Sequence, residues 1–124
     1  MKILLQTLLV LTLAGRLSQT AFAQDPVKQS PDKYKAILNN EKARVLDVRL
    51  KPGQKSPMHS HPDYIIYALS GGTAQFWDAQ GKTSKMTLRP GQCAWRNGES
   101  HAVQNIGKTT IHVLNIEIKG FRLF

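Results

Sequence analysis

Cysteine is almost absent from this chain, since Cys93 is the only one among its 124 residues. A lone thiol cannot form an intrachain disulfide, even in an oxidising compartment. We expect Cys93 to be buried as a small apolar side chain in a short strand. Acidic residues are also scarce, with 8 against 17 lysines and arginines and a net charge of +9. This charge favours anionic ligands and partners.

Long helical patterns, internal repeats and low-complexity tracts are lacking as well, and the length fits a single domain. The basic residues are scattered, and no motif places aromatic side chains among them for stacking on nucleobases. We therefore expect no nucleic-acid partner, and we interpret most of the lysines and arginines as solvated positions on strands.

Residues 1–23 have the pattern of a secretory signal peptide. Lys2 provides the positive start, an apolar run covers 3–14, and Ala21-Phe22-Ala23 places small residues at the cleavage site. The run is shorter than the ~20 apolar residues that a membrane span needs. We predict cleavage after Ala23, a periplasmic or secreted protein and no stable membrane anchor. The mature chain would keep 15 basic and 8 acidic residues, a net charge of +7.

The rest of the chain alternates between apolar and polar residues in short segments separated by glycine and proline turns. After a polar lead over 24–30, Pro31-Asp32 opens the folded part. Residues 34–38 fit a strand or one helical turn. Strands are expected over 44–50, 64–69, 73–78, 82–88, 92–96, 101–105 and 110–118. Short strands at regular spacing indicate an all-β fold, an antiparallel sandwich or jelly-roll barrel.

Three of the four histidines are placed to meet. His59 and His61 stand one residue apart in Met58-His59-Ser60-His61-Pro62, so in an extended strand their side chains point to one face. His101 follows another turn and could supply a third imidazole from a neighbouring strand. Imidazole is the commonest metal-binding side chain near neutral pH. His112 shares a strand face with Leu114 and Ile116, and we interpret it as a structural histidine.

Two motifs in this order resemble those of the cupin family. The first motif is glycine, five residues, His-x-His and a closing glycine, as in Gly53, His59-Ser60-His61 and Gly71-Gly72. The second is matched by the spacing of Gly98, His101 and Asn105, although its Gly91 half is one residue short and Asn97 stands at the proline. The resemblance covers roughly residues 41–118, with an N-terminal segment over 24–40 before it and a tail over 119–124 after it. The stretch over 51–72, together with Asn105-Ile106-Gly107, is similar to small single-domain cupins, some of them linked to β-alanine breakdown.

The resemblance implies a jelly-roll β-barrel with His59, His61 and His101 around a divalent metal, which could be iron, manganese, nickel or zinc. The chain departs from the motif at its glutamate, whose place falls on Tyr64, Ile65 or Ile66. Three neutral histidines would leave the metal its full charge and open positions. Among cupins, thiol dioxygenases resemble that arrangement, with ferrous iron on three histidines.

Two functions stay open at this point. One is an enzyme, a metal-dependent and dioxygenase-like cupin acting on a small anionic molecule. The other is a non-catalytic cupin module that binds a small ligand or a metal. Tyr64 and Arg96 are the candidate substrate-binding residues, Arg96 through a charge-assisted fork to an anion. A homodimer is expected, because Tyr64–Leu69 is apolar on both faces and cupins commonly pair.

Overall fold

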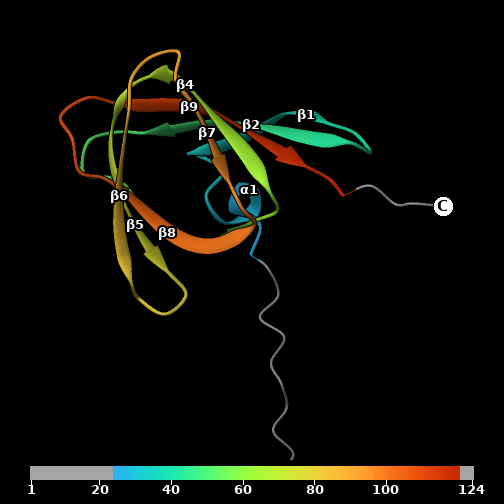
Figure 1. Cartoon of the computed structure of the whole chain (residues 1–124), viewed down its shortest axis with the longest axis horizontal. Helices are drawn as coiled ribbons and strands as arrows, with labels where there is room; N and C mark the ends of the chain where they lie inside the picture. Colours follow the sequence, from blue (N-terminus) through green and yellow to red (C-terminus); the bar gives the residue numbers. More distant parts are fainter. Residues whose placement is uncertain (1–23, 121–124) are drawn as a thin grey trace, which may run out of the picture.

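A computed structural model describes residues 24–120, so the predicted signal peptide at 1–23 and the last four residues lie outside the described part. Nine strands form two antiparallel sheets that make a jelly-roll barrel (Figure 1). The elements are α1 (Pro26–Gln29), β1 (Tyr34–Asn39), β2 (Ala43–Leu50), β3 (Lys55–His61), β4 (Tyr64–Ser70), β5 (Gly72–Asp78), β6 (Thr83–Leu88), β7 (Cys93–Arg96), β8 (Glu99–Asn105) and β9 (Ile111–Ile118). The predicted all-β jelly-roll fold is confirmed.

The two sheets have the strand orders β1-β2-β9-β4-β7 and β3-β8-β5-β6. Their inner faces are apolar because alternate residues of each strand point inward. Leu46, Val48 and Leu50 of β2 are at most 3% exposed, as their alternation predicts. On β4, by contrast, only alternate residues are buried, while Ile65 and Tyr67 on the outer face are partly exposed. The core therefore lies between the sheets, and the outer face of β4 has apolar side chains in contact with solvent.

Three of the predicted turns contain a glycine whose backbone requires it. Gly53, Gly81 and Gly91 have φ values of 79°, 81° and 84°, in the left-handed region that side chains disfavour. The turn at Gly53 leads into β3, which carries the first two histidines. The turn at Gly91 leads into β7. These turns fix where the strands begin, and so help to set which residues face inward.

Several expectations are resolved or corrected by the structure. Residues 34–39 form strand β1 rather than a helical turn, and the polar stretch before it contains the four-residue helix α1, which the sequence pattern did not reveal. The prediction that Cys93 is buried is wrong, because β7 is an edge strand and the cysteine lies on its exposed side. Among residues 24–120, no helix has the length and apolar character needed to cross a membrane.

Candidate metal centre

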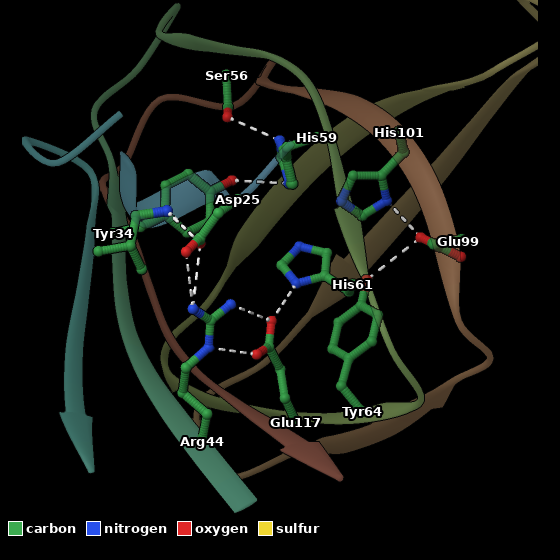
Figure 2. Close-up of polar contacts among 11 residues, drawn as sticks. Asp25, Tyr34, Arg44, Ser56, His59, His61, Tyr64, Glu99, His101 and Glu117 are labelled. Carbon is green, nitrogen blue, oxygen red and sulfur yellow. Dashed lines mark hydrogen bonds and ion pairs between the residues drawn. The ribbon is translucent and has the colours of Figure 1, made fainter. Parts of the chain in front are cut away.

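Strands β3 and β8 bring the three predicted histidines together inside the barrel. His59 lies directly opposite His101 in the antiparallel pairing, and His61 follows two residues later on the same face. The ring centroids are 4.8 Å apart for His59 and His61, 4.8 Å for His59 and His101, and 5.2 Å for His61 and His101. All three side chains are at most 5% exposed. One potential ligand atom from each lies within 4.8 Å of the others (Figure 2).

The Nδ1 atom of each ring contacts an oxygen atom of the protein. His59 Nδ1 donates to the carbonyl oxygen of Pro57 at 2.8 Å, and His61 Nδ1 donates to Glu117 Oε1 at 2.7 Å. His101 Nδ1 donates to Glu99 Oε1. With Nδ1 carrying the proton, Nε2 holds the free lone pair, and that is the state a metal ligand needs. His61 Nε2 is buried and has no hydrogen-bond partner among the described residues.

Burial keeps His59 and His101 in the neutral form. Desolvation, and then the neighbouring His101 and His61 rings, lower the pKa of His59 to about 3. Burial also lowers the pKa of His101, although Glu99 acts in the opposite direction. Near neutral pH these imidazoles are therefore neutral and able to coordinate a cation.

Glu117 links His61 to the first folded residues of the chain. Its carboxylate accepts from His61 on one side and from Arg44 on the other, with Arg44 Nε 2.6 Å from Glu117 Oε2. Arg44 Nη1 in turn donates to both carboxylate oxygens of Asp25 at 3.1 Å. Burial opposes ionisation, but the hydrogen bonds from His61 and Arg44 hold the pKa of Glu117 below its usual range. A continuous polar chain thus runs from Asp25 to the histidine cluster (Figure 2).

Glu99 holds the ring of His101 in the same way that Glu117 holds the ring of His61. Despite partial burial, the hydrogen bonds from His101 and Arg96 lower the pKa of Glu99 to about 2. Arg96 Nη2 donates to Glu99 Oε1 at 2.5 Å, and the guanidinium lies 4.6 Å from the centre of the Phe76 ring. Tyr64 Oη donates to the same carboxylate oxygen at 3.2 Å. Both candidate substrate-binding residues, Tyr64 and Arg96, therefore converge on Glu99.

The three positions to which the motif's glutamate was assigned have different surroundings. Tyr64 is 1% exposed and stacks at 4.6 Å from His61, and Ile66 lies in the core. Ile65 lies on the outer face, paired across the sheet with Trp95 and Ile116. Within residues 24–120, the only cluster that could hold a metal consists of the three histidines, and the nearby carboxylates contact their Nδ1 atoms.

An internal cavity of about 60 Å³ adjoins the cluster, and His101 forms part of its wall. Tyr34 and Tyr64 also line it, and burial raises the pKa of Tyr34 to about 12, so its hydroxyl stays protonated. Arg96 is not among the side chains that line the cavity. The metal centre therefore adjoins a small pocket within the barrel that has room for a small molecule.

The residues present fit a divalent metal ion. The donor set consists of three imidazoles with fixed ring orientations, and one of their Nε2 atoms is buried with no partner among the described residues. Nitrogen donors of this kind suit iron, manganese, nickel and zinc alike. His112 is not part of the cluster. It lies on the opposite side of β9, where its Nε2 is 3.0 Å from Asp47 Oδ2.

Sequence reasoning missed Glu99, Glu117 and Arg44, which surround the cluster. It described β9 by the apolar face that carries His112, Leu114 and Ile116, but the inward face carries Val113, Asn115 and Glu117. Glu117 could have been recognised because it lies four residues after Val113 and so on the same, inward face of the strand. Glu99 was visible as the residue two positions before His101 and therefore on the same strand face.

Comparisons with known proteins agree with this geometry. The family profile described as "Cupin domain" matches residues 46–117. A cupin domain protein from Bordetella pertussis Tohama I has 27% identity and a TM-score of 0.64, and the alignment covers 70% of this chain and 92% of that one. A protein from Klebsiella pneumoniae with a double-stranded β-helix domain has 20% identity and a TM-score of 0.57, covering 77% and 88%.

A third solved structure, from Thermotoga maritima, is described as a predicted oxalate decarboxylase. It has 27% identity and a TM-score of 0.50, and the alignment covers 68% of this chain and 77% of that one. No curated protein matches this chain. The similarities therefore extend over most of the barrel, and the three-histidine cluster within such a domain indicates a divalent metal site.

Proposed function

This chain belongs to the cupin family, and from that premise we propose that it binds a divalent metal ion through His59, His61 and His101 and takes up a small anionic molecule there. The observation that carries the proposal is the way in which the three rings are held. Each Nδ1 is held by an oxygen of the protein, which leaves the Nε2 lone pairs for a metal. His59 Nε2 also lies 3.5 Å from the Tyr34 hydroxyl, a contact that a metal would replace. Such outer contacts fix the tautomer and the direction of metal-binding histidines.

The charges around the cluster support an anionic ligand. Glu99 and Glu117 bring two negative charges close to the histidines, but each is paired with an arginine, Arg96 and Arg44 respectively. Arg44 also pairs with Asp25, so these five groups sum to −1, and a metal held by three imidazoles would keep a net positive charge. The net charge of +9 adds a field that attracts anions.

Different residues of the chain would have different roles at this site. The Nδ1 contacts orient the three rings, and Tyr64, whose pKa is raised mainly by burial, keeps a protonated hydroxyl directed at Glu99. The apolar residues of the barrel exclude water from the cavity side of the cluster. A bound divalent metal would supply Lewis-acid polarisation of a ligand oxygen or sulfur, and iron would add chemistry with dioxygen.

Catalysis, in the form of a dioxygenase-like reaction, is the first candidate and a non-catalytic binding module is the second. The three-histidine donor set favours the enzyme, since it leaves open positions for a ligand. The Thermotoga neighbour described as a predicted oxalate decarboxylase makes small organic acids a first class to test, with thiols the second. β-Alanine joins this screen because of the resemblance to cupins linked to its breakdown.

Elemental analysis of the protein purified without added metal tests the proposal. We expect close to one equivalent of a first-row transition metal per chain, and less than a tenth of that in a variant lacking all three histidines. Equal metal in both proteins would overturn it. Oxygen uptake by the iron-loaded protein with organic acids or thiols then separates the enzyme from the binding module.

We propose that the protein is exported, periplasmic or secreted, and that it pairs as a homodimer. The dimer is supported by an apolar row across all five strands of one sheet. Register pairs Leu38 with Val45, Val45 with Ile116, Ile116 with Ile65 and Ile65 with Trp95. Trp95 is 56% exposed and Leu38 45%.

A further inference from the structure

The cavity beside the metal centre is small. Its volume is about 60 Å³, whereas an apolar cavity of ~150 Å³ holds benzene, so this one has room for roughly two to four non-hydrogen atoms. His101 belongs to its wall, which means that a molecule in the cavity reaches the histidine cluster. The part of a ligand that occupies the cavity, here called its body, is therefore short.

The wall of the cavity is almost entirely apolar. Although the chain carries 17 basic and 8 acidic residues, none of the side chains lining the cavity is an aspartate, glutamate, lysine or arginine. The buried apolar residues of the wall include Val48, Ile66, Phe76, Val103, Ile111 and Val113. A charged group placed among them would lose its hydration without gaining a counter-ion. The body of the ligand is therefore uncharged.

Asn115 on β9 is one of the few polar side chains of the wall, which also include Tyr34, Tyr64, Ser70 and His101. Asn115 is 6% exposed, and its Oδ1 is buried without a hydrogen-bond partner among the described residues. A buried acceptor without a donor is destabilising, so an O–H or N–H group of a bound molecule would relieve it. Asn115 precedes Glu117, which holds His61, by two residues, a distance of about 7 Å along the strand. A molecule with two or three carbons between its ends spans such a distance.

We infer that the site selects a small monoanion whose anionic head lies at the three histidines, whose short body is apolar, and whose far end carries a hydrogen-bond donor that meets Asn115. This inference rests on the proposed function for the position of the head. It excludes dicarboxylates from the cavity, because their second charge would enter a wall without a counter-ion.

Three probes with the same two-methylene stem test the far end: 3-hydroxypropanoate with a hydroxyl, butanoate with a methyl and succinate with a carboxylate. Titrated into the zinc-loaded protein by calorimetry, 3-hydroxypropanoate should bind tightest and succinate at least tenfold more weakly. In Asn115→Leu the order of the first two should reverse, with butanoate the tighter. Asn115→Val repeats the test with a smaller side chain, and Gln75→Leu, on β5 outside the cavity wall, should keep the wild-type order.

Succinate binding as tightly as the other two, or an unchanged preference for the hydroxyl in a folded and zinc-loaded Asn115 variant, would overturn the inference. If the protein takes up no zinc, the proposed function fails, and the cavity is then tested alone. Titration of 1-propanol into the metal-free protein should saturably shift the methyl NMR signals of Ile66 and Val113 but not those of Ile37, which is 59% exposed on β1. Absence of that shift would overturn the apolar-body assignment independently of the metal.

Discussion

Glu117 and His61 are 56 positions apart in the chain, and Glu117 Oε1 accepts a hydrogen bond from His61 Nδ1 at 2.7 Å. Both side chains are almost fully buried, and Arg44 occupies the other side of the carboxylate. The contact fixes both the tautomer and the direction of the imidazole. It also carries a negative charge to a position next to the metal centre without making the carboxylate a ligand.

Replacing any one of His59, His61 and His101 with alanine should remove most of the bound metal, because each change deletes one of three donors. The barrel should stay folded, since the histidines are not the apolar core. His112→Ala is the matched control, because His112 lies on the outer side of β9 and pairs with Asp47. Equal loss in all four variants, or in none, measured by elemental analysis, would refute the assignment.

Glu117→Gln should lower metal affinity about 10- to 100-fold, the usual effect of changing a group that orients a ligand histidine. The amide oxygen still accepts from His61, but the negative charge is lost and Arg44 is left with less compensation. Asp47→Asn changes a carboxylate that contacts a histidine outside the cluster, so its metal affinity should match the wild type. Competition with a chromophoric chelator measures both, and equal affinities for the two variants would contradict the role of Glu117.

The metal-free protein should lose stability as the pH falls below about 6.5. The unfolded chain binds a proton at each histidine in this range, whereas burial lowers the pKa of His59 to about 3 in the folded state. The unfolded state therefore binds more protons, and at pH 5 the penalty from His59 alone is about 2 kcal/mol. Glu99 adds to the loss only below about pH 4.5, because its pKa is lowered to about 2.

Urea unfolding at pH 7.5 and pH 5 measures this difference. His59→Gln should reduce it, because the glutamine does not titrate, and added zinc at pH 7.5 should increase it by stabilising the neutral form of the cluster. A wild-type protein equally stable at both pH values would show that the histidines are not held neutral.

Trp95→Lys should convert a dimer into a monomer, since it places a charge at one end of the apolar row. Sedimentation velocity at micromolar concentration distinguishes the two states. Ile106→Lys is the control, because Ile106 is 40% exposed and is not part of the row. A wild-type protein that sediments as a monomer, or a Trp95→Lys dimer, would remove the pairing proposal.

Expression with the leader in a bacterium should yield a periplasmic protein that begins at Gln24. Gln24 and Asp25 belong to the described fold, because the carbonyl oxygen of Gln24 accepts from Ser60 N at 2.9 Å and Asp25 caps helix α1, so the predicted cut would keep both residues. Intact-mass measurement of the purified protein identifies its first residue, and a cytoplasmic protein that retains Met1 would contradict export.

Local patterns were enough to predict the barrel and to pick out the histidines. Alternation placed the inner face of β2, and the two-residue spacing of His59 and His61 put both rings on one side of β3. The surroundings of the cluster could not be predicted, because they depend on pairing between distant segments. Glu117 reaches His61 only through the position of β9 beside β4, and Arg44 reaches Glu117 because β2 and β9 pair in register.

The surroundings of Cys93 and Asn115 were also beyond prediction from the sequence. Cys93 is apolar enough to look buried in a local window, but β7 ends its sheet, and exposure there depends on the strand order and not on the residue itself. Asn115 looks like a polar break in an apolar strand, and its place beside a cavity appears only once both sheets are assembled.

The polar chain from Asp25 through Arg44 and Glu117 to His61 connects the start of the folded region with a metal ligand in three contacts. The choice of first residue in any recombinant version is therefore a choice about the metal centre. A protein shortened past Asp25, or one with a bulky affinity tag fused at Gln24, would keep every histidine and still alter the support behind one of them.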